Sequence, residues 1–367
     1  MTKYDAVIIG GGHNGLVTAA YLARAKRKVL VLERRELVGG CAVTEEIWPG
    51  FRVSTGAYLS SLLQERIVRE LELERFGYRV DAKDPAFFSI FPDGRHFFMW
   101  QDRGKTLAEM AKFSKRDAEV YPAYEEQLER ISQVVEGLLL TTPPQFPPRG
   151  PLDFVDYLKT AGRVRGLRGK DLVALVKIFT QSAAEFLDEW FESEQVKVTL
   201  ATDGVIGANG GPRSPGTAYI LLHHSMGGIA GHRGLWGFVR GGMGAVSEAI
   251  AAAARAAGAE IRTSAPVAKV LVRGGAAYAV ALENGDEIEA AWVASNLDPK
   301  VTFLKLLDPG VLDHLSANEA VDMTTLIERT IAAGKRSVVF PLREYWIDVG
   351  RLDDLQRASD EFQRFFR

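Results

Sequence analysis

The sequence predicts an α/β protein: a Rossmann-like nucleotide-binding domain with a β-meander, interrupted by an inserted and mostly helical cap. Three observations support this fold class. A glycine-rich turn near the N-terminus lies between an apolar run and a helical pattern. Residues 104–200 carry apolar residues at helical spacing. Residues 260–295 alternate short apolar runs with turn signals, as expected of a β-meander.

The first motif is a strand–turn–helix–strand unit that ends on an acid. The apolar run Ala6–Ile9 precedes the spacing G-x-G-x-x-G, whose glycines are Gly10, Gly12 and Gly15. Glycines at these positions allow the tight turn, the approach of a pyrophosphate and close helix packing. Glu33 ends the second apolar run, 18 residues beyond Gly15, near the spacing of about 20 expected for an acid that binds ribose hydroxyls. Together these features predict a dinucleotide site, with the pyrophosphate at the helix N-terminus.

Composition narrows the class of protein. The chain has 367 residues, of which 47% are hydrophobic and 25% charged, the mix of an ordinary globular protein. Its net charge of −2 gives no reason to expect nucleic acid as a partner. Cys41 is the single cysteine, which excludes an internal disulfide and a two-cysteine redox centre. With no apolar run of roughly 18 residues and no recognisable signal peptide, we expect a cytoplasmic protein.

The helical block holds one basic cluster. A proline-rich segment, residues 141–151, interrupts the helical pattern and predicts a loop. Arg163, Arg165, Arg168 and Lys170 follow it, separated by glycines. This cluster is a solvated loop on one interpretation and a peripheral contact with an anionic membrane surface on the other, since polybasic segments are attracted to anionic lipid.

Residues 202–240 are rich in glycine and proline, which predicts a long irregular segment of the kind that lines sites. His223 and His224 lie in it and are candidate catalytic residues, although packed structural histidines are the alternative. If the pair lies in a strand, the two side chains point to opposite faces and do not share a metal ion. We therefore predict no metal site.

The sequence from the glycine turn to Gly39-Gly40 resembles the FAD-binding start of the phytoene desaturase and amine oxidase group of flavoproteins. Within that group it resembles the branch named pyridine nucleotide-disulfide oxidoreductase domain-containing protein 2. The resemblance implies FAD as cofactor, with Glu33 on the adenosine ribose, Gly39-Gly40 against the middle of the cofactor and Val267 against the adenine. The full set of expected cofactor-binding residues is Gly10, Gly12, Gly15, Glu33, Arg34, Gly39, Gly40, Gly56, Gly242, Val267 and Asn296.

The predicted domains follow from the same patterns. Residues 1–60 and 236–313 form the FAD-binding domain, and residues 61–235 form the substrate and cap domain. Residues 318–367 resemble the C-terminus of sugar-nucleotide nucleotidyltransferases, so the C-terminal part of the flavoprotein is expected to be truncated or replaced.

The resemblance implies an FAD-dependent oxidoreductase, acting as a dehydrogenase, desaturase or isomerase on a largely apolar, isoprenoid-like substrate with an unidentified electron acceptor. The alternative is a non-catalytic FAD- or ADP-binding remnant, or a hybrid chain whose flavin pocket is incomplete. The sequence does not indicate an oligomeric state.

Overall fold

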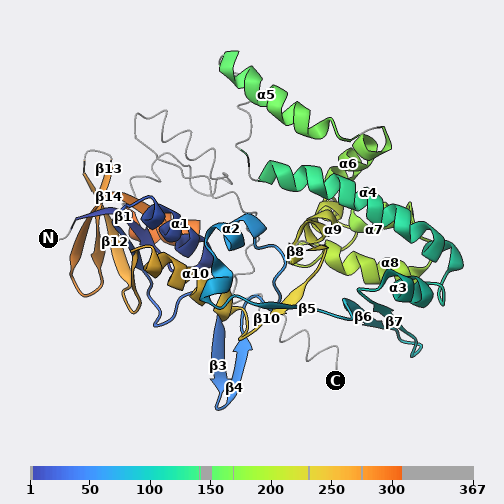
Figure 1. Cartoon of the computed structure of the whole chain (residues 1–367), viewed down its shortest axis with the longest axis horizontal. Helices are drawn as coiled ribbons and strands as arrows, with labels where there is room; N and C mark the ends of the chain where they lie inside the picture. The colour runs from blue at the N-terminus through green and yellow to red at the C-terminus, as the bar shows by residue number, and fades with distance from the viewer. Residues whose placement is uncertain are drawn as a thin grey trace. The chain divides into compact units, whose positions relative to one another are not determined.

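The computed structural model describes residues 3–139, 141, 151–167, 169–229, 232–273 and 276–307 (Figure 1). These residues divide into two compact units. The first unit holds the described residues up to Ala82 and those from Trp236 onward, and the second holds residues 83–235.

The first unit is built on a six-stranded mixed sheet with strand order β11-β2-β1-β14-β13-β12. Its strands are β1 (Tyr4–Ile9), β2 (Val29–Leu32), β11 (Glu260–Arg262), β12 (Val267–Arg273), β13 (Ala276–Leu282) and β14 (Glu287–Ser295). The strands from β11 to β14 in this order run parallel, whereas β13 pairs antiparallel with both β12 and β14. The predicted strand–turn–helix–strand unit and the predicted meander are thus joined through β14.

Because successive side chains of a strand point to opposite faces, the sheet has two separate apolar cores, one on each face. Ile8 of β1 packs with helices α1 (His13–Arg24) and α10 (Gly244–Ala256) on one face. Its neighbours Val7 and Ile9 pack with meander residues on the other face. Successive strand residues point to opposite faces, so an uninterrupted apolar strand serves both cores.

Shorter elements complete the first unit. They are the hairpin β3 (Thr44–Trp48) and β4 (Phe51–Ser54), α2 (Glu65–Glu70), η1 (Leu73–Phe76), β5 (Val80–Ala82), β10 (Gly237–Val239), α11 (Pro299–Val301) and η3 (Thr302–Leu306). The second compact unit begins at Lys83, whereas the predicted start of the cap is residue 61. Leu71 and Leu73 are buried in the core with α10, and β5 pairs with β10, so residues 61–82 belong to the first unit.

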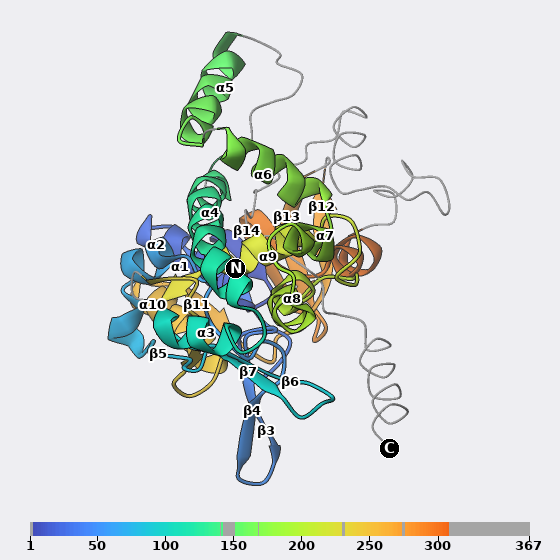
Figure 2. The same ribbon diagram turned by 90° about the vertical axis from the view of Figure 1, so that its right-hand side faces the viewer.

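The second unit is mostly helical (Figure 2). It contains the hairpin β6 (Phe87–Ile90) and β7 (His96–Met99), then α3 (Arg103–Met110), α4 (Lys115–Leu139), α5 (Pro151–Val164), α6 (Lys170–Thr180), α7 (Ala183–Asp188), α8 (Glu194–Ala201), η2 (Thr202–Gly204), α9 (Thr217–Met226) and the pair β8 (Gly228–Ile229) and β9 (His232–Arg233). The helices between residues 103 and 201 confirm the predicted helical pattern. The segment predicted to be irregular differs, because α9 lies within it.

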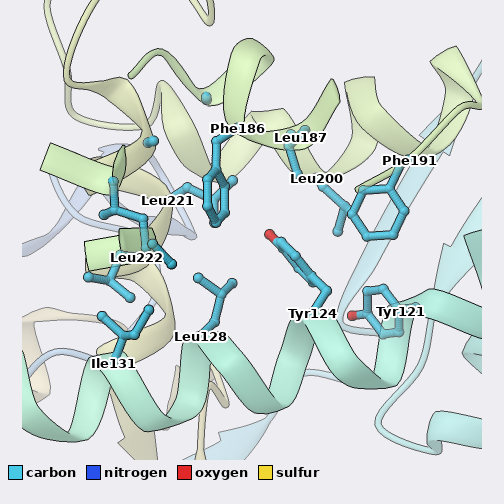
Figure 3. Close-up of a cluster of buried hydrophobic side chains, with 14 of the residues drawn as sticks. Tyr121, Tyr124, Leu128, Ile131, Phe186, Leu187, Phe191, Leu200, Leu221 and Leu222 are labelled. Atoms are coloured by element: carbon cyan, nitrogen blue, oxygen red, sulfur yellow. The ribbon is translucent and has the colours of Figure 1, made fainter. Parts of the chain in front are cut away.

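The long helix α4 organises the core of the second unit (Figure 3). Tyr121, Tyr124, Leu128 and Ile131 lie along one side of α4 at spacings of three and four residues, and all are buried. They face apolar side chains of α7 and α9. None of the helices within the described ranges combines the length and the apolar character that a bilayer span requires.

Candidate dinucleotide site

Three predicted site residues follow directly on three neighbouring strands. Gly10 follows β1, Glu33 follows β2 and Asn296 follows β14. Because these strands are parallel, their carboxyl ends meet at one edge of the sheet. The backbone hydrogen bonds Gly10 N to Leu32 O (2.8 Å) and Asn296 N to Ile9 O (2.8 Å) extend the pairing to that edge. In open α/β sheets this edge is where ligands bind, at the point where the strand order reverses.

The glycine turn leaves the start of α1 accessible to an anion. Gly12 is the N-cap residue of α1; it provides no side-chain cap, and the first turn contains no acidic residue. The first turn of a helix presents N–H groups that have no acceptor within the helix, and its dipole attracts negative charge. This end of α1 therefore suits a pyrophosphate.

Gly15 and Gly12 are required by close packing. A Cβ atom on Gly15 would lie 2.5 Å from Gly10 O and 3.0 Å from Asn296 Nδ2, and one on Gly12 would lie 2.8 Å from Asn296 Nδ2. The Asn296 amide thus lies against the turn, so the structure brings together the three predicted glycines and the predicted asparagine.

Glu33 holds the loops of this edge in place. Its side chain is buried, with 7% exposed, and each carboxylate oxygen accepts a backbone N–H. Oε2 accepts from Gly11 (2.7 Å) and Oε1 accepts from Arg35 (2.9 Å). Each carboxylate oxygen has two acceptor lone pairs, so the side chain retains acceptor capacity for ribose hydroxyls. Sequence reasoning missed Gly11 and Arg35, because backbone donors leave no signal in the residue type.

The Gly39-Gly40 pair continues the same edge. Gly39 N donates to Gly11 O (2.8 Å), and Gly39 has a φ of +128°, in the region that favours glycine. A Cβ on Gly40 would lie 3.3 Å from the Gly12 Cα atom. Gly56 packs closely against the residue that follows the pair, since a Cβ added to it would lie 2.5 Å from Cys41 O. The pair therefore lies against the glycine turn.

A segment between β11 and β12 crosses the end of β2. Ser264 N donates to Arg35 O (2.8 Å) and Ala265 N donates to Glu33 O (2.8 Å). Val267 begins β12 two residues later and is half-buried. This connection places Val267 near Glu33, whereas the Arg34 side chain is exposed. Contact of Arg34 and Val267 with a cofactor stays a prediction.

Gly242 has a packing role that the sequence did not reveal. It lies in the turn before α10, and the N–H groups that follow it are capped by the β3–β4 hairpin. Met243 N donates to Ser54 Oγ (3.0 Å) and Gly244 N donates to Thr44 Oγ1 (2.9 Å). These pairs are about 200 residues apart in the chain, which is why no local pattern predicted them. A role for Gly242 in cofactor binding stays a prediction.

His223 and His224 lie in the second unit, on helix α9 and not in a strand. His224 is buried, and its Nδ1 pairs with Ile220 O one turn earlier (2.8 Å). Burial raises the pKa of Asp203, and the positive charges of His224 and Lys83 oppose that rise. Within the described ranges, no cluster of three His, Cys, Asp or Glu side chains could hold a metal ion. The predicted cofactor residues all belong to the other unit.

The half-buried His223 predicts a pH dependence of stability. Burial, and secondly the charge of His224, lower the pKa of His223 from its ordinary value of 6.5 to about 4. As the pH falls from 6.5 to 4, the unfolded chain binds a proton at this site that the folded chain does not, so folding is weakened. We expect His223→Gln to remove about 2 kcal/mol of the acid-induced loss in the free energy of unfolding.

Urea unfolding at pH 7 and pH 4.5 measures this effect. His96→Gln, a change at an exposed histidine of the β6–β7 hairpin, is the matched control and should keep the wild-type pH dependence. Equal loss of stability in His223→Gln and the wild type would contradict the assignment.

The glycine turn, the acid and the strand order together have the arrangement that is typical of dinucleotide-binding α/β proteins. Residues 15–331 match the family model described as flavin containing amine oxidoreductase. The match covers most of the chain, so the chain belongs to the flavin-containing amine oxidoreductase family, a family of FAD-dependent oxidoreductases. The predicted family is thereby confirmed.

Known proteins show the same relationship. The chain is 41% identical over 318 residues to pyridine nucleotide-disulfide oxidoreductase domain-containing protein 2 of Rattus norvegicus, a match covering 83% of this chain and 55% of the relative. It is 27% identical over 321 residues to phytoene desaturase of Cercospora nicotianae, covering 82% and 46%. The chain therefore spans about half the length of these relatives.

The fold is also found in a solved structure. An oxidoreductase from Methanosarcina mazei aligns with a TM-score of 0.51 and 16% identity, covering 89% of this chain and 64% of that one. The comparisons give no support to the nucleotidyltransferase-like tail predicted for residues 318–367, which lies outside the described residues. The family match runs past residue 313, the predicted end of the flavoprotein part.

Proposed function

We propose that the chain binds FAD on its first unit and acts as an FAD-dependent dehydrogenase, desaturase or isomerase on a largely apolar substrate. One observation carries the proposal. The buried Glu33 carboxylate, at the end of β2, holds the loop that leads into the uncapped N-terminus of α1. An acid acceptor and an anion site next to each other match the ribose and the pyrophosphate of one dinucleotide.

The residues at this edge fit the adenosine diphosphate half of FAD. Glu33 would accept hydrogen bonds from the ribose hydroxyls through its remaining lone pairs. The first turn of α1 would bind the pyrophosphate, because Gly12 provides no side-chain cap and the turn contains no acidic residue. Asn296, whose amide lies against both glycines, would fix the position of the phosphates.

When bound, FAD supplies a hydride acceptor, and the protein supplies binding, orientation and exclusion of water. The described residues at this edge of the sheet would bind the cofactor. Their contacts are mostly backbone groups on a rigid sheet edge, which suits precise placement of a cofactor. The electron acceptor is not identified by these residues.

The apolar substrate class rests on the family relationship. The related phytoene desaturase of Cercospora nicotianae is named for a hydrocarbon substrate, and it matches over most of this chain. We propose a substrate of similar apolar character. The alternative is a module that binds FAD or ADP without turnover, since the residues brought together at the site serve the adenosine and pyrophosphate part.

Purification and ligand titration test the proposal. We expect the purified full chain to carry a flavin absorbance, or to gain it after addition of FAD, and the released cofactor to be FAD by chromatography. Calorimetric titration of the apoprotein should show binding of FAD and of ADP, and much weaker binding of FMN, which lacks the adenosine half. No binding of FAD or ADP would overturn the proposal.

Turnover separates the two candidate functions. Bleaching of the bound flavin by an apolar alkene or terpenoid under anaerobic conditions, followed by reoxidation with an added electron acceptor, identifies an oxidoreductase. Binding of FAD without bleaching by any member of a broad substrate panel favours the non-catalytic module.

A further inference from the structure

Helices α5 and α6 of the second unit each expose a stripe of large apolar side chains. On α5 the stripe consists of Phe154, Val155 and Leu158, with Leu158 73% exposed. On α6 it consists of Leu172, Val173, Val176 and Phe179, and Val176 is 65% exposed. Both stripes follow the spacing i, i+1, i+4, which places their members on one side of each helix. We call these seven residues the α5–α6 stripes.

The exposed stripe of α6 is separate from the side of α6 that packs into the protein. Ala174 and Ile178 are buried in the core of the second unit. The helix is therefore apolar on two sides, of which only one is buried in the core. A surface helix normally turns polar residues outward, so an outward apolar stripe indicates a further interaction.

Basic residues border both stripes. Residues 151–180 contain six Lys or Arg and three Asp, a local excess of +3 in a chain of net charge −2. On α6, Lys170 and Lys177 lie three and four residues from Val173 and so next to the stripe. Arg163 lies near the C-terminal end of α5, five residues after Leu158. The positive charge therefore lies alongside the apolar surface.

Of the cations on this border, Lys177 is neutralised by Glu189. Asp171 pairs with Arg130 (3.1 Å) and Glu189 pairs with Lys177 (2.5 Å). Arg163, Arg165 and Lys170 are exposed, and no carboxylate within the described ranges lies in ion-pair distance of them. Three cations thus remain available for a partner of negative charge.

We propose that the α5–α6 stripes and the cations Arg163, Arg165 and Lys170 dock on the surface of a membrane that contains anionic lipid. Helices with an apolar stripe and a basic flank lie in the plane of the bilayer interface, with the stripe in the acyl region. The long Lys and Arg side chains reach from that depth to the lipid phosphates. A symmetric dimer fits less well, because identical basic borders would face each other across it.

Vesicle binding of the full chain tests the proposal. We expect the protein to co-sediment with phosphatidylcholine vesicles that contain phosphatidylserine, and to bind pure phosphatidylcholine vesicles much more weakly. Val173→Asp/Val176→Asp should abolish binding by placing charges in the stripe. Arg163→Gln/Lys170→Gln should weaken it about thirtyfold, at about fivefold for each charge. Binding of the wild type should fall with added salt.

The matched control is Val198→Asp, an equally exposed valine on helix α8 outside the stripes. It should bind vesicles as the wild type does, and circular dichroism should show the same melting curve for all variants. Equal loss of binding in Val198→Asp, or no preference for the anionic vesicles, overturns the proposal. So does a dimer on light scattering that Val173→Asp/Val176→Asp converts to a monomer without any vesicle binding by the wild type.

Discussion

The Gly15→Ala variant is expected to lose its flavin and about 3 kcal/mol of its free energy of unfolding. The added Cβ would lie 2.5 Å from Gly10 O, a backbone atom of the turn, and 3.0 Å from Asn296 Nδ2. The turn cannot yield without moving the end of β1, because Gly10 N is bound to Leu32 O. Helix α1 must therefore shift away from the sheet, which separates the pyrophosphate site from Glu33.

Gly137→Ala provides the control for this change. Gly137 is also helical, in α4, and nothing lies within 4 Å of the position that its Cβ would take. Alanine is favoured over glycine in helices, so this variant should be more stable by roughly 0.5–1 kcal/mol. Urea unfolding and flavin content, measured for both variants, test these expectations. A Gly15→Ala protein that keeps its flavin at full stoichiometry contradicts the packing argument.

The second large effect is expected for Glu33→Gln. The amide retains one oxygen acceptor, but its NH₂ group faces a backbone N–H of either Gly11 or Arg35, so two donors meet in a buried position. An unsatisfied buried donor costs about 1–3 kcal/mol. We expect FAD binding to weaken by about a hundredfold, because the variant disturbs the loop and also loses an acceptor for the ribose.

Glu36→Gln is the matched control for Glu33→Gln. Glu36 lies three residues further on and its side chain is exposed. Replacing its carboxylate by an amide should leave both the free energy of unfolding and the FAD affinity within experimental error of the wild type. Calorimetric Kd values for FAD and ADP measure the effect, and an unchanged ADP affinity in Glu33→Gln would show that Glu33 does not bind the ribose.

The local elements of the first unit were predictable because each is marked by a characteristic residue pattern within a short stretch of the sequence. The apolar run of β1, the glycine spacing and Glu33 are contiguous in the sequence, and the turns of the meander are marked by glycine and asparagine. Asn296, which only the family resemblance indicated, follows β14 directly, with its amide against the turn. Short-range geometry follows from residue type when the signal and the structure cover the same few residues.

Contacts that join distant segments were not predictable in this way. The cap of α10 by Thr44 and Ser54 joins parts of the chain about 200 residues apart. The boundary at Lys83 depends on the burial of Leu71 and Leu73 against α10, and α9 forms within a segment whose glycines suggested a loop. Tertiary packing overrode the local preference in these places.

By itself, the sequence determined the strand–turn–helix–strand unit that is typical of dinucleotide-binding proteins, since glycines and an acid at one spacing around a strand and a helix suffice for it. Only the tertiary structure decided what Glu33 contacts, which surface of α6 remains open and where the two units divide. Those properties depend on which distant side chains and backbone groups meet, and a residue's own type does not specify its partners.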